Sequence, residues 1–197
     1  MASTHDTPGA APRPLTESPA LAARAADLLR TPGAMLQLAP EEAAAVAARM
    51  ALVHYAAGAT LLREGDQNAG HLLLLLEGSV EVDTAGPSGA PGSARADAVA
   101  VSVLGPGSIV GEMALLDGAP RSASCTARTP VTAAALSRRA LQQLLDEQPR
   151  LAAKLLIGLA KRTADRLRAL GDQLQMYAQL SARQQQELER LRAAPPR

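Results

Sequence analysis

Apolar and polar residues alternate at helical spacing in the first part of the chain. The stretch 21–30 and the stretch 40–50 both show this spacing, and Pro32–Gly33 interrupts the sequence between them. Pro40 is followed directly by two glutamates, and the dipole of a helix favours carboxylates in its first turn. We therefore expect two short helices in this region.

Residues 51–136 have a different sequence pattern, in which short apolar runs alternate with turn residues such as Ala57–Gly58 and Glu64–Asp66. Turns every eight to twelve residues are typical of an all-β sandwich or barrel. The run His71–Leu76 is expected to be a fully buried strand, and Val80–Val82 an alternating one. This region is therefore expected to be mainly β, with helices flanking it.

The last part of the chain is helical again by its pattern. Ser137 is expected to cap a short helix that ends near Gln148, and Pro149 to begin a helix that runs to residue 193. Its apolar seam has steps of three and four: Leu156, Leu159, Thr163, Leu167, Leu170, Leu174, Tyr177, then Ser181 and Gln184 in polar form, then Leu188 and Leu191. Such a helix is too long to bury its whole seam on one small barrel, so we expect a homodimer through 149–193. The alternative is one amphipathic helix packed on its own domain.

The remaining boundaries follow from composition. Residues 1–20 are rich in Pro, Thr, Ser and Ala and are expected to be a disordered leader, and 84–97 a low-complexity hairpin loop. These boundaries leave a domain over 21–148, the long helix over 149–193 and a tail over 194–197.

Composition narrows the function classes. Apolar residues make up 47% of the chain, but Tyr55 and Tyr177 are its only aromatic residues, so the core must be aliphatic. A net charge of +1 gives no global attraction to nucleic acid or to an acidic membrane. A single cysteine, Cys125, excludes an internal disulfide framework and favours a cytoplasmic location, and no apolar run is long enough to span a membrane.

One segment carries chemistry. Gly111 allows close approach of a ligand to the backbone, and residues 112–116 can form one helical turn whose N–H groups make an anion site. Arg121 adds a cation that matches phosphate oxygens, Glu112 can accept a hydrogen bond from a ribose hydroxyl, and Ser122 can donate to the phosphate. Alternatively, Glu112 and Arg121 pair with each other across a turn and Ser122 is an ordinary strand residue.

The order of these residues resembles a known motif. Gly111-Glu112-Met113-Ala114-Leu115, followed by Arg121-Ser122-Ala123, is similar to the phosphate-binding cassette of the cyclic-nucleotide-binding family. Catabolite-activator-type bacterial regulators and regulatory subunits of cyclic-AMP-dependent kinase share that cassette. The resemblance covers residues 38–170 and implies a double-stranded jelly roll that binds a cyclic nucleotide monophosphate. The ligand-binding residues that it implies are Gly111, Glu112, Met113, Ala114, Arg121, Ser122 and Ala123.

The resemblance also indicates how the base would be read. In the catabolite-activator branch the long helix supplies an arginine and then a Thr-Ser pair to the adenine edge. Arg162 matches that arginine, whereas Arg166 and Leu167 stand where the hydroxyl pair would be. Cyclic AMP is the first expectation, with Arg162 and Arg166 near the base, and cyclic GMP or a cyclic dinucleotide are the alternatives.

These observations predict a bacterial regulatory protein without enzymatic activity, a stand-alone cyclic-nucleotide sensor that signals through its dimer helix to an effector protein. About 20 residues follow Met176, too few for a helix-turn-helix, so DNA binding is disfavoured. One alternative is a ligand-free interaction module that keeps the fold. Another is a small jelly-roll metalloenzyme, but His5, His54 and His71 do not form the cluster that a metal site needs, so no metal is expected.

Overall fold

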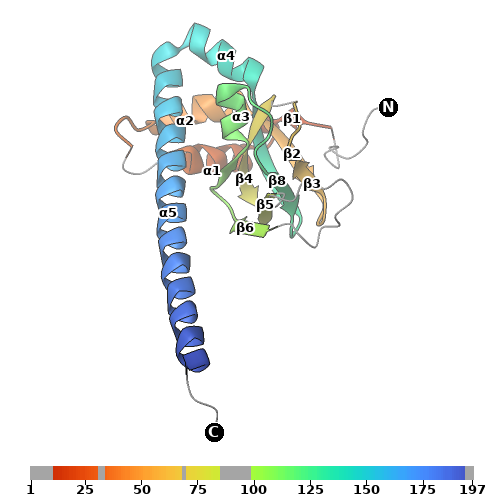
Figure 1. Ribbon diagram of the computed structural model, residues 1–197. Coiled ribbons are helices and arrows are strands. Elements are labelled where there is room, and N and C mark those ends of the chain that lie inside the picture. Colours follow the sequence, from red (N-terminus) through yellow and green to blue (C-terminus); the bar gives the residue numbers. More distant parts are fainter. Residues whose placement is uncertain (1–10, 31–33, 68–69, 85–98, 194–197) are drawn as a thin grey trace. The chain divides into compact units, whose positions relative to one another are not determined.

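The chain forms two compact units, residues 1–158 and residues 159–197. The structure, a computed structural model, describes residues 11–30, 34–67, 70–84 and 99–193 (Figure 1). The elements of the first unit are β1 (Arg13–Pro14), η1 (Leu15–Glu17), α1 (Pro19–Leu29), α2 (Pro40–Ala47), β2 (Ala51–Tyr55), β3 (Thr60–Leu62), β4 (His71–Glu77), β5 (Val80–Thr84), β6 (Val99–Leu104), β7 (Ile109–Val110), α3 (Glu112–Asp117), β8 (Ser124–Ala127), β9 (Val131–Ser137) and α4 (Arg138–Glu147). Helix α5 (Pro149–Ala193) begins in the first unit and makes up the described part of the second.

Two antiparallel sheets form the body of the first unit. One has the strand order β1-β2-β9-β4-β7 and the other the order β3-β8-β5-β6. The core between them is aliphatic apart from one tyrosine and one cysteine, and strands of both sheets contribute to it: Val53, Tyr55, Leu61, Leu62, Leu73, Leu75, Val80, Val82, Val110, Cys125, Ala127, Val131 and Ala133. The predicted fold class, mainly β with flanking helices, is confirmed.

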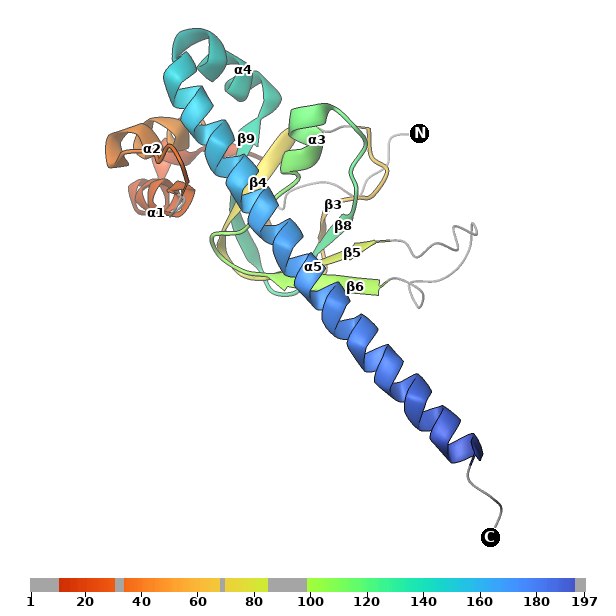
Figure 2. The same cartoon turned by 60° about the vertical axis from the view of Figure 1, so that its left-hand side comes forward.

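Strand β4 explains the unusual run of five leucines. Alternate side chains of a strand point to opposite faces. Leu73 and Leu75 lie in the core between the sheets, whereas Leu72, Leu74 and Leu76 are equally buried on the other face. Helices α1 and α2 lie beside that face, and α1 packs against β4 (Figure 2). The strand is therefore apolar on both faces, as predicted for His71–Leu76.

The helical predictions hold with small shifts at the ends. The Ser137 side chain accepts a hydrogen bond from the backbone N–H of Ala140 and so caps α4 as predicted. Pro149 is the first residue of α5, also as predicted. At the other end of the fold, Glu42 in the first turn of α2 forms an ion pair with Lys154 of α5, at 2.6 Å and 2.7 Å. This pair ties the N-terminal helices to the start of the long helix.

The expectation of a disordered leader over 1–20 needs a correction. Ordered structure begins by residue 11, because β1 pairs with β2 and Leu15 is fully buried. The backbone N–H of Leu15 also donates to the carbonyl of Met50, at 3.0 Å. Composition alone suggested a leader, but one buried leucine and a strand pairing hold this segment in place. Residues 1–10, the predicted loop after Thr84 and the tail 194–197 lie outside the described residues.

In the second unit α5 continues as one uninterrupted helix to Ala193. Leu167 and Leu174 are each 70% exposed and Tyr177 is 65% exposed. These three residues belong to the predicted apolar seam. Over the described ranges, no helix has the length and apolar character needed to cross a membrane.

Candidate functional site

The cassette begins at a glycine whose backbone adopts a left-handed conformation. Gly111 has φ 78° and stands directly before α3, and Gly118, with φ 74°, ends the helix. Such angles cost side-chain-bearing residues free energy, so both positions suit glycine. Within the described residues no side chain caps α3, which leaves the N–H groups of its first turn to other partners. The prediction of one helical turn over 112–116 is confirmed.

Arg121 lies at the centre of the site. Its side chain is 4% exposed. Nη1 donates to the backbone carbonyl of Gly111 and Nη2 donates to that of His71, both at 2.8 Å. Because the guanidinium is planar and rigid, two such bonds fix both its position and its orientation. A single side chain thus joins the start of the cassette to the first residue of β4.

The backbone of Arg121 is held as firmly as its side chain. Its N–H donates to the carbonyl of Asp66 at 3.0 Å, and its carbonyl accepts from the N–H of Gly65 at 2.8 Å. The turn Glu64-Gly65-Asp66, which follows β3, therefore fixes the backbone of the arginine through two hydrogen bonds.

Gly111 and Arg121 fit each other closely. A Cβ atom built on Gly111 would lie 2.4 Å from Nη1 of Arg121 and 3.0 Å from Cδ1 of Leu62. Real Cβ atoms do not approach other heavy atoms so closely. A side chain at 111 would therefore have to displace the guanidinium of Arg121, in addition to the cost of its backbone angle.

Glu112, the first residue of α3, is buried with 7% of its surface exposed. No hydrogen bond or ion pair joins its carboxylate to any part of the chain that the structure describes. The alternative interpretation, in which Glu112 pairs with Arg121 across a turn, is therefore not what the structure shows. Its oxygens are not among the buried atoms without a partner in the described chain, so the carboxylate reaches the surface of the site and can accept a hydrogen bond from a donor outside the protein.

The other predicted cassette residues differ in exposure. Ala114 is buried, Ala123 packs against the core, and Met113 and Ser122 are exposed. The hydroxyl of Ser122 donates to the sulfur of Met113 at 3.9 Å. The structure thus brings the two ends of the predicted motif, Gly111–Ala114 and Arg121–Ala123, together around one arginine.

Two residues that contribute hydrogen bonds to the site were not predicted from the sequence. His71 supplies a carbonyl to Arg121, and Arg138 donates through Nη2 to the carbonyl of Ala114, the third residue of α3, at 2.9 Å. Burial is the main cause that lowers the pKa of His71 below its ordinary value of 6.5, the charge of Arg121 lowers it further, and Asp66 opposes both. The imidazole is therefore neutral at pH 7.

Ser102 on β6 is a third residue that the sequence did not single out. Its hydroxyl is buried and has no hydrogen-bond partner among the described residues. In the antiparallel register Ser102 lies opposite Val82, and directly paired residues place their side chains on the same face of a sheet. Since Val82 belongs to the core, this hydroxyl also faces the space between the sheets.

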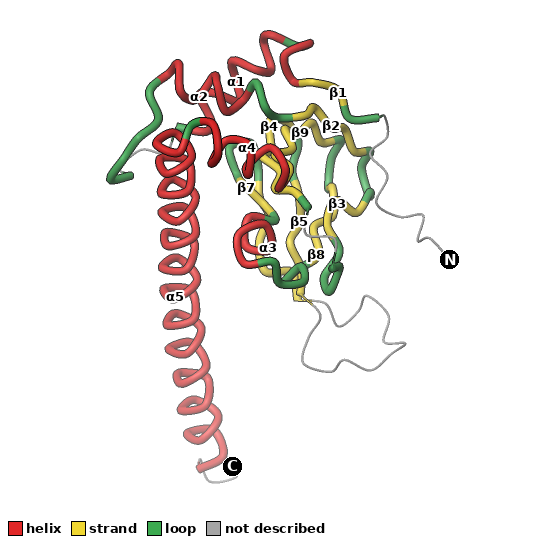
Figure 3. Tube along the Cα trace, turned by 90° about the horizontal axis from the view of Figure 1, so that it is seen from above, coloured by secondary structure: helices red, strands yellow, loops and turns green. Residues whose placement is uncertain are grey.

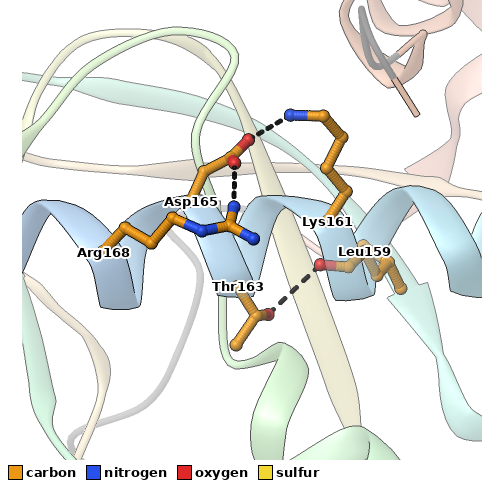
Figure 4. Close-up of polar contacts among 5 residues, drawn as sticks. All are labelled: Leu159, Lys161, Thr163, Asp165 and Arg168. Atoms are coloured by element: carbon orange, nitrogen blue, oxygen red, sulfur yellow. Dashed lines mark hydrogen bonds and ion pairs between the residues drawn. The ribbon is translucent and has the colours of Figure 1, made fainter.

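Arg162 and Arg166 lie on α5, in the second unit, one helical turn apart. The helix surface around them carries a charge cluster: Asp165 is bonded by Lys161 and, at 3.0 Å, by Arg168 (Figure 4). The hydrogen bond from Lys161 is the main cause that lowers the pKa of Asp165.

Thr163 lies on the same stretch of α5. Its hydroxyl donates to the carbonyl of Leu159 at 3.2 Å, which satisfies the hydroxyl within the helix (Figure 4). The seam position 163 therefore presents mainly the methyl group of its side chain.

In the described ranges, no three His, Cys, Asp or Glu side chains come together as a metal site would require. The charged groups that the fold does gather are one buried guanidinium and one buried carboxylate. Such a pair can recognise a ligand that carries both an anion and a hydroxyl donor.

Comparison with known proteins agrees with this chemistry. The family described as "Cyclic nucleotide-binding domain" matches residues 52–148. A crystal structure of a cyclic nucleotide-binding domain from Methylobacillus flagellatus is 32% identical, with a TM-score of 0.70, over 78% of this chain and 82% of that one. The chain belongs to the cyclic-nucleotide-binding domain family, as the cassette predicted.

Two curated relatives are regulators. A CRP-like cAMP-activated global transcriptional regulator of Mycobacterium tuberculosis is 26% identical over 69% of this chain and 57% of its own length. A cAMP-dependent protein kinase regulatory subunit of Colletotrichum orbiculare is 37% identical over 60% of this chain and 28% of its own length. The chain thus matches less than two thirds of each of these proteins.

Proposed function

We propose that this protein is a cyclic-nucleotide sensor: it binds a cyclic nucleotide monophosphate at the cassette and signals through α5 to a partner. The observation that carries the proposal is that the two charged residues buried in the described chain are both in the cassette: Arg121, held by the carbonyl of Gly111, and Glu112, whose carboxylate has no hydrogen bond or ion pair with the described residues. A ribose hydroxyl would give Glu112 its missing donor. The phosphate would meet the first turn of α3, Arg121 and the hydroxyl of Ser122.

Cyclic AMP is the first candidate ligand. The Mycobacterium relative is described as cAMP-activated and the Colletotrichum relative as cAMP-dependent. In this chain, however, Arg166 and Leu167 replace the hydroxyl pair that reads adenine in the catabolite-activator branch. Arg162 and Arg166 are the proposed base contacts. Cyclic GMP and a cyclic dinucleotide are therefore the necessary comparators.

Calorimetric titration with each of these three ligands tests the proposal. We expect one ligand to bind with a stoichiometry of one per chain. Glu112→Gln should weaken binding moderately, because an amide oxygen still accepts a hydrogen bond from a ribose hydroxyl. Glu41→Gln removes the same charge from an exposed position of α2 and should leave binding unchanged.

The absence of binding by all three ligands would favour the second interpretation, a ligand-free interaction module that keeps the fold. Equal losses in Glu112→Gln and Glu41→Gln would mean that net charge, and not the cassette carboxylate, sets the affinity.

We further propose that α5 forms a homodimer through its seam. Leu167, Leu174 and Tyr177 are exposed large apolar side chains on one helix, and seam residues recur in steps of three and four, which is the coiled-coil pattern. A monomer would leave this seam in water.

Light scattering of a double variant, Leu170→Asp with Leu174→Asp, tests the dimer. The change places four like charges in a twofold-symmetric seam, so we expect a folded monomer. Gln175→Asp with Gln179→Asp adds the same charge to the outer face of the helix and should leave the dimer intact. A persistent dimer in the seam variant would place the subunit contact elsewhere, and a monomeric wild type would refute this proposal.

A further inference from the structure

A cavity lies at the side of the sandwich where β1 and β3 are the edge strands. Figure 3 shows these two strands on the same side of the fold. The cavity has a volume of about 860 Å³. Its described lining comes from the segment Pro12–Pro14, the turn Ala48–Met50 and the strands β2, β3, β4 and β9, with Asp66, Gly70 and Arg121. Cavities of this size, mostly apolar with a few polar groups, are those that hold small organic molecules.

This cavity is not the cassette. Of the cassette residues only Arg121 lines it, and β5, β6, β7, β8 and α3 contribute none of its described lining. Glu112, which carries the proposed function, is likewise absent from that lining. The inference drawn from the cavity therefore stands whether or not the cassette binds a nucleotide.

The inner wall of the cavity is apolar. It is formed mainly by Val53, Leu61, Leu62 and Leu73, whose side chains also belong to the core between the sheets. Their surfaces favour a hydrocarbon or aromatic group over water, because burying apolar surface is the main source of binding free energy in such a pocket.

The charged groups around the cavity are predominantly cationic. In the described lining, the arginines are Arg13, Arg49 and Arg121 and the one carboxylate is that of Asp66, while His71 is neutral at pH 7. Arg49 is occupied by an ion pair with Glu147 at 2.7 Å and by the carbonyl of Ala45. Arg13 lines the cavity and is itself exposed to solvent, and none of the described residues forms an ion pair with it.

From an apolar wall and an exposed arginine in the same lining we infer that this cavity is a second ligand site, for a small amphipathic carboxylic acid. The hydrocarbon part would lie against Val53, Leu61 and Leu73. The carboxylate would meet the guanidinium of Arg13, since planar guanidinium and carboxylate groups form paired, charge-assisted hydrogen bonds. Hydrocarbon burial supplies affinity, and the arginine selects acids over neutral molecules of the same length.

Calorimetric titration of the full chain with decanoate, below its micellar concentration, tests the inference, and decanol serves as the neutral comparator. We expect one decanoate per chain and weaker binding of decanol. Arg13→Glu should weaken decanoate binding at least about tenfold, equivalent to ~1.4 kcal/mol, and leave decanol binding nearly unchanged. The matched control is Arg128→Glu, an exposed arginine of the β8–β9 turn that does not line the cavity.

A second variant tests the cavity itself. Ala51 lies on β2 opposite Pro14, among the residues that line the cavity, and Ala51→Leu would narrow it. We expect this variant to lose affinity for decanoate and decanol alike, with the fold verified by circular dichroism. Because Arg13 lies on an exposed edge strand, its variant remains informative if Ala51→Leu fails to fold.

Three results would overturn the inference. One is no decanoate binding by the full chain, whether the cavity is then empty or filled by another part of the protein. Another is an equal loss in Arg13→Glu and Arg128→Glu, which would indicate non-specific attraction to positive charge. The last is undiminished binding in Arg13→Glu and in folded Ala51→Leu, which would place the acid elsewhere on the surface.

Discussion

Replacing Arg121 by alanine is the sharpest perturbation that the structure offers, because one side chain supports two distant parts of the backbone. Arg121→Ala removes the donors to the carbonyls of Gly111 and His71. A buried acceptor left without its donor costs about 1–3 kcal/mol. With two such acceptors and some relief from water entering the vacated space, we expect the free energy of unfolding to fall by about 2–4 kcal/mol.

Urea denaturation followed by far-ultraviolet circular dichroism measures this loss. In a thermal scan the same loss corresponds to a midpoint lower by roughly 4–16 °C for a domain of this size. Arg128→Ala, at an exposed position of the β8–β9 turn, is the matched control and should change the free energy of unfolding by less than about 0.5 kcal/mol. Arg121→Lys keeps the charge but not the planar fork, so it should recover only part of the loss.

The same variant should abolish cyclic-nucleotide binding, measured at a temperature where circular dichroism shows that the variant is still folded. Loss of a charge-assisted hydrogen bond weakens binding at least about tenfold, and a phosphate left without its cation weakens it further. A change in unfolding free energy of less than about 0.5 kcal/mol would refute the reasoning, because the two carbonyls would then have other donors. Unchanged affinity would remove the phosphate from this site.

Two further predictions concern neighbours of this arginine. In urea denaturation, Gly111→Ala should lower the free energy of unfolding by about 1–3 kcal/mol more than Gly118→Ala. Both glycines have positive φ, but only a Cβ at 111 would meet a buried guanidinium, at 2.4 Å. Equal losses would show that the side chain of Arg121 moves aside at no cost. Folding lowers the pKa of His71, so the folded state favours the neutral ring. The contribution of His71 to stability is therefore fully present above the pKa of the unfolded state, about 6.5, and is lost as the pH falls below that value. NMR titration should show the pKa of His71 rising in Arg121→Ala, and an unaltered pKa would exclude the charge of Arg121 as a cause.

The sequence predicted local structure well where one residue determines it. Ser137 caps α4 through a bond to a residue three positions away, and the turn over 112–116 follows directly from Gly111. The run His71–Leu76 was expected to be a fully buried strand, and its leucines are buried on both faces of β4. Each of these features depends on contacts close in sequence or on simple apolarity.

Contacts between residues far apart in the chain could not be predicted from the sequence. The bond from Arg121 to the carbonyl of His71 spans 50 residues, and any residue type could have supplied that carbonyl. Arg138 followed a predicted cap and looked like an ordinary surface arginine, although it donates a hydrogen bond to the backbone of α3. Residues 11–20 have the composition of a flexible segment, and only the buried side chain of Leu15 and the pairing of β1 with β2 give them structure.

The aliphatic core gives this protein an unusual optical property. With no tryptophan and no phenylalanine, its near-ultraviolet signal comes from two phenol rings, and each unit holds one of them. Tyr55, 6% exposed between the sheets, is shielded from a dissolved quencher such as acrylamide, whereas Tyr177, 65% exposed on α5 of a single chain, is open to it unless a partner helix covers the seam. The emission of Tyr55 therefore stays protected while the barrel is folded, and a change in the quenchable fraction reports whether the helix is paired, in the unlabelled, unmutated chain.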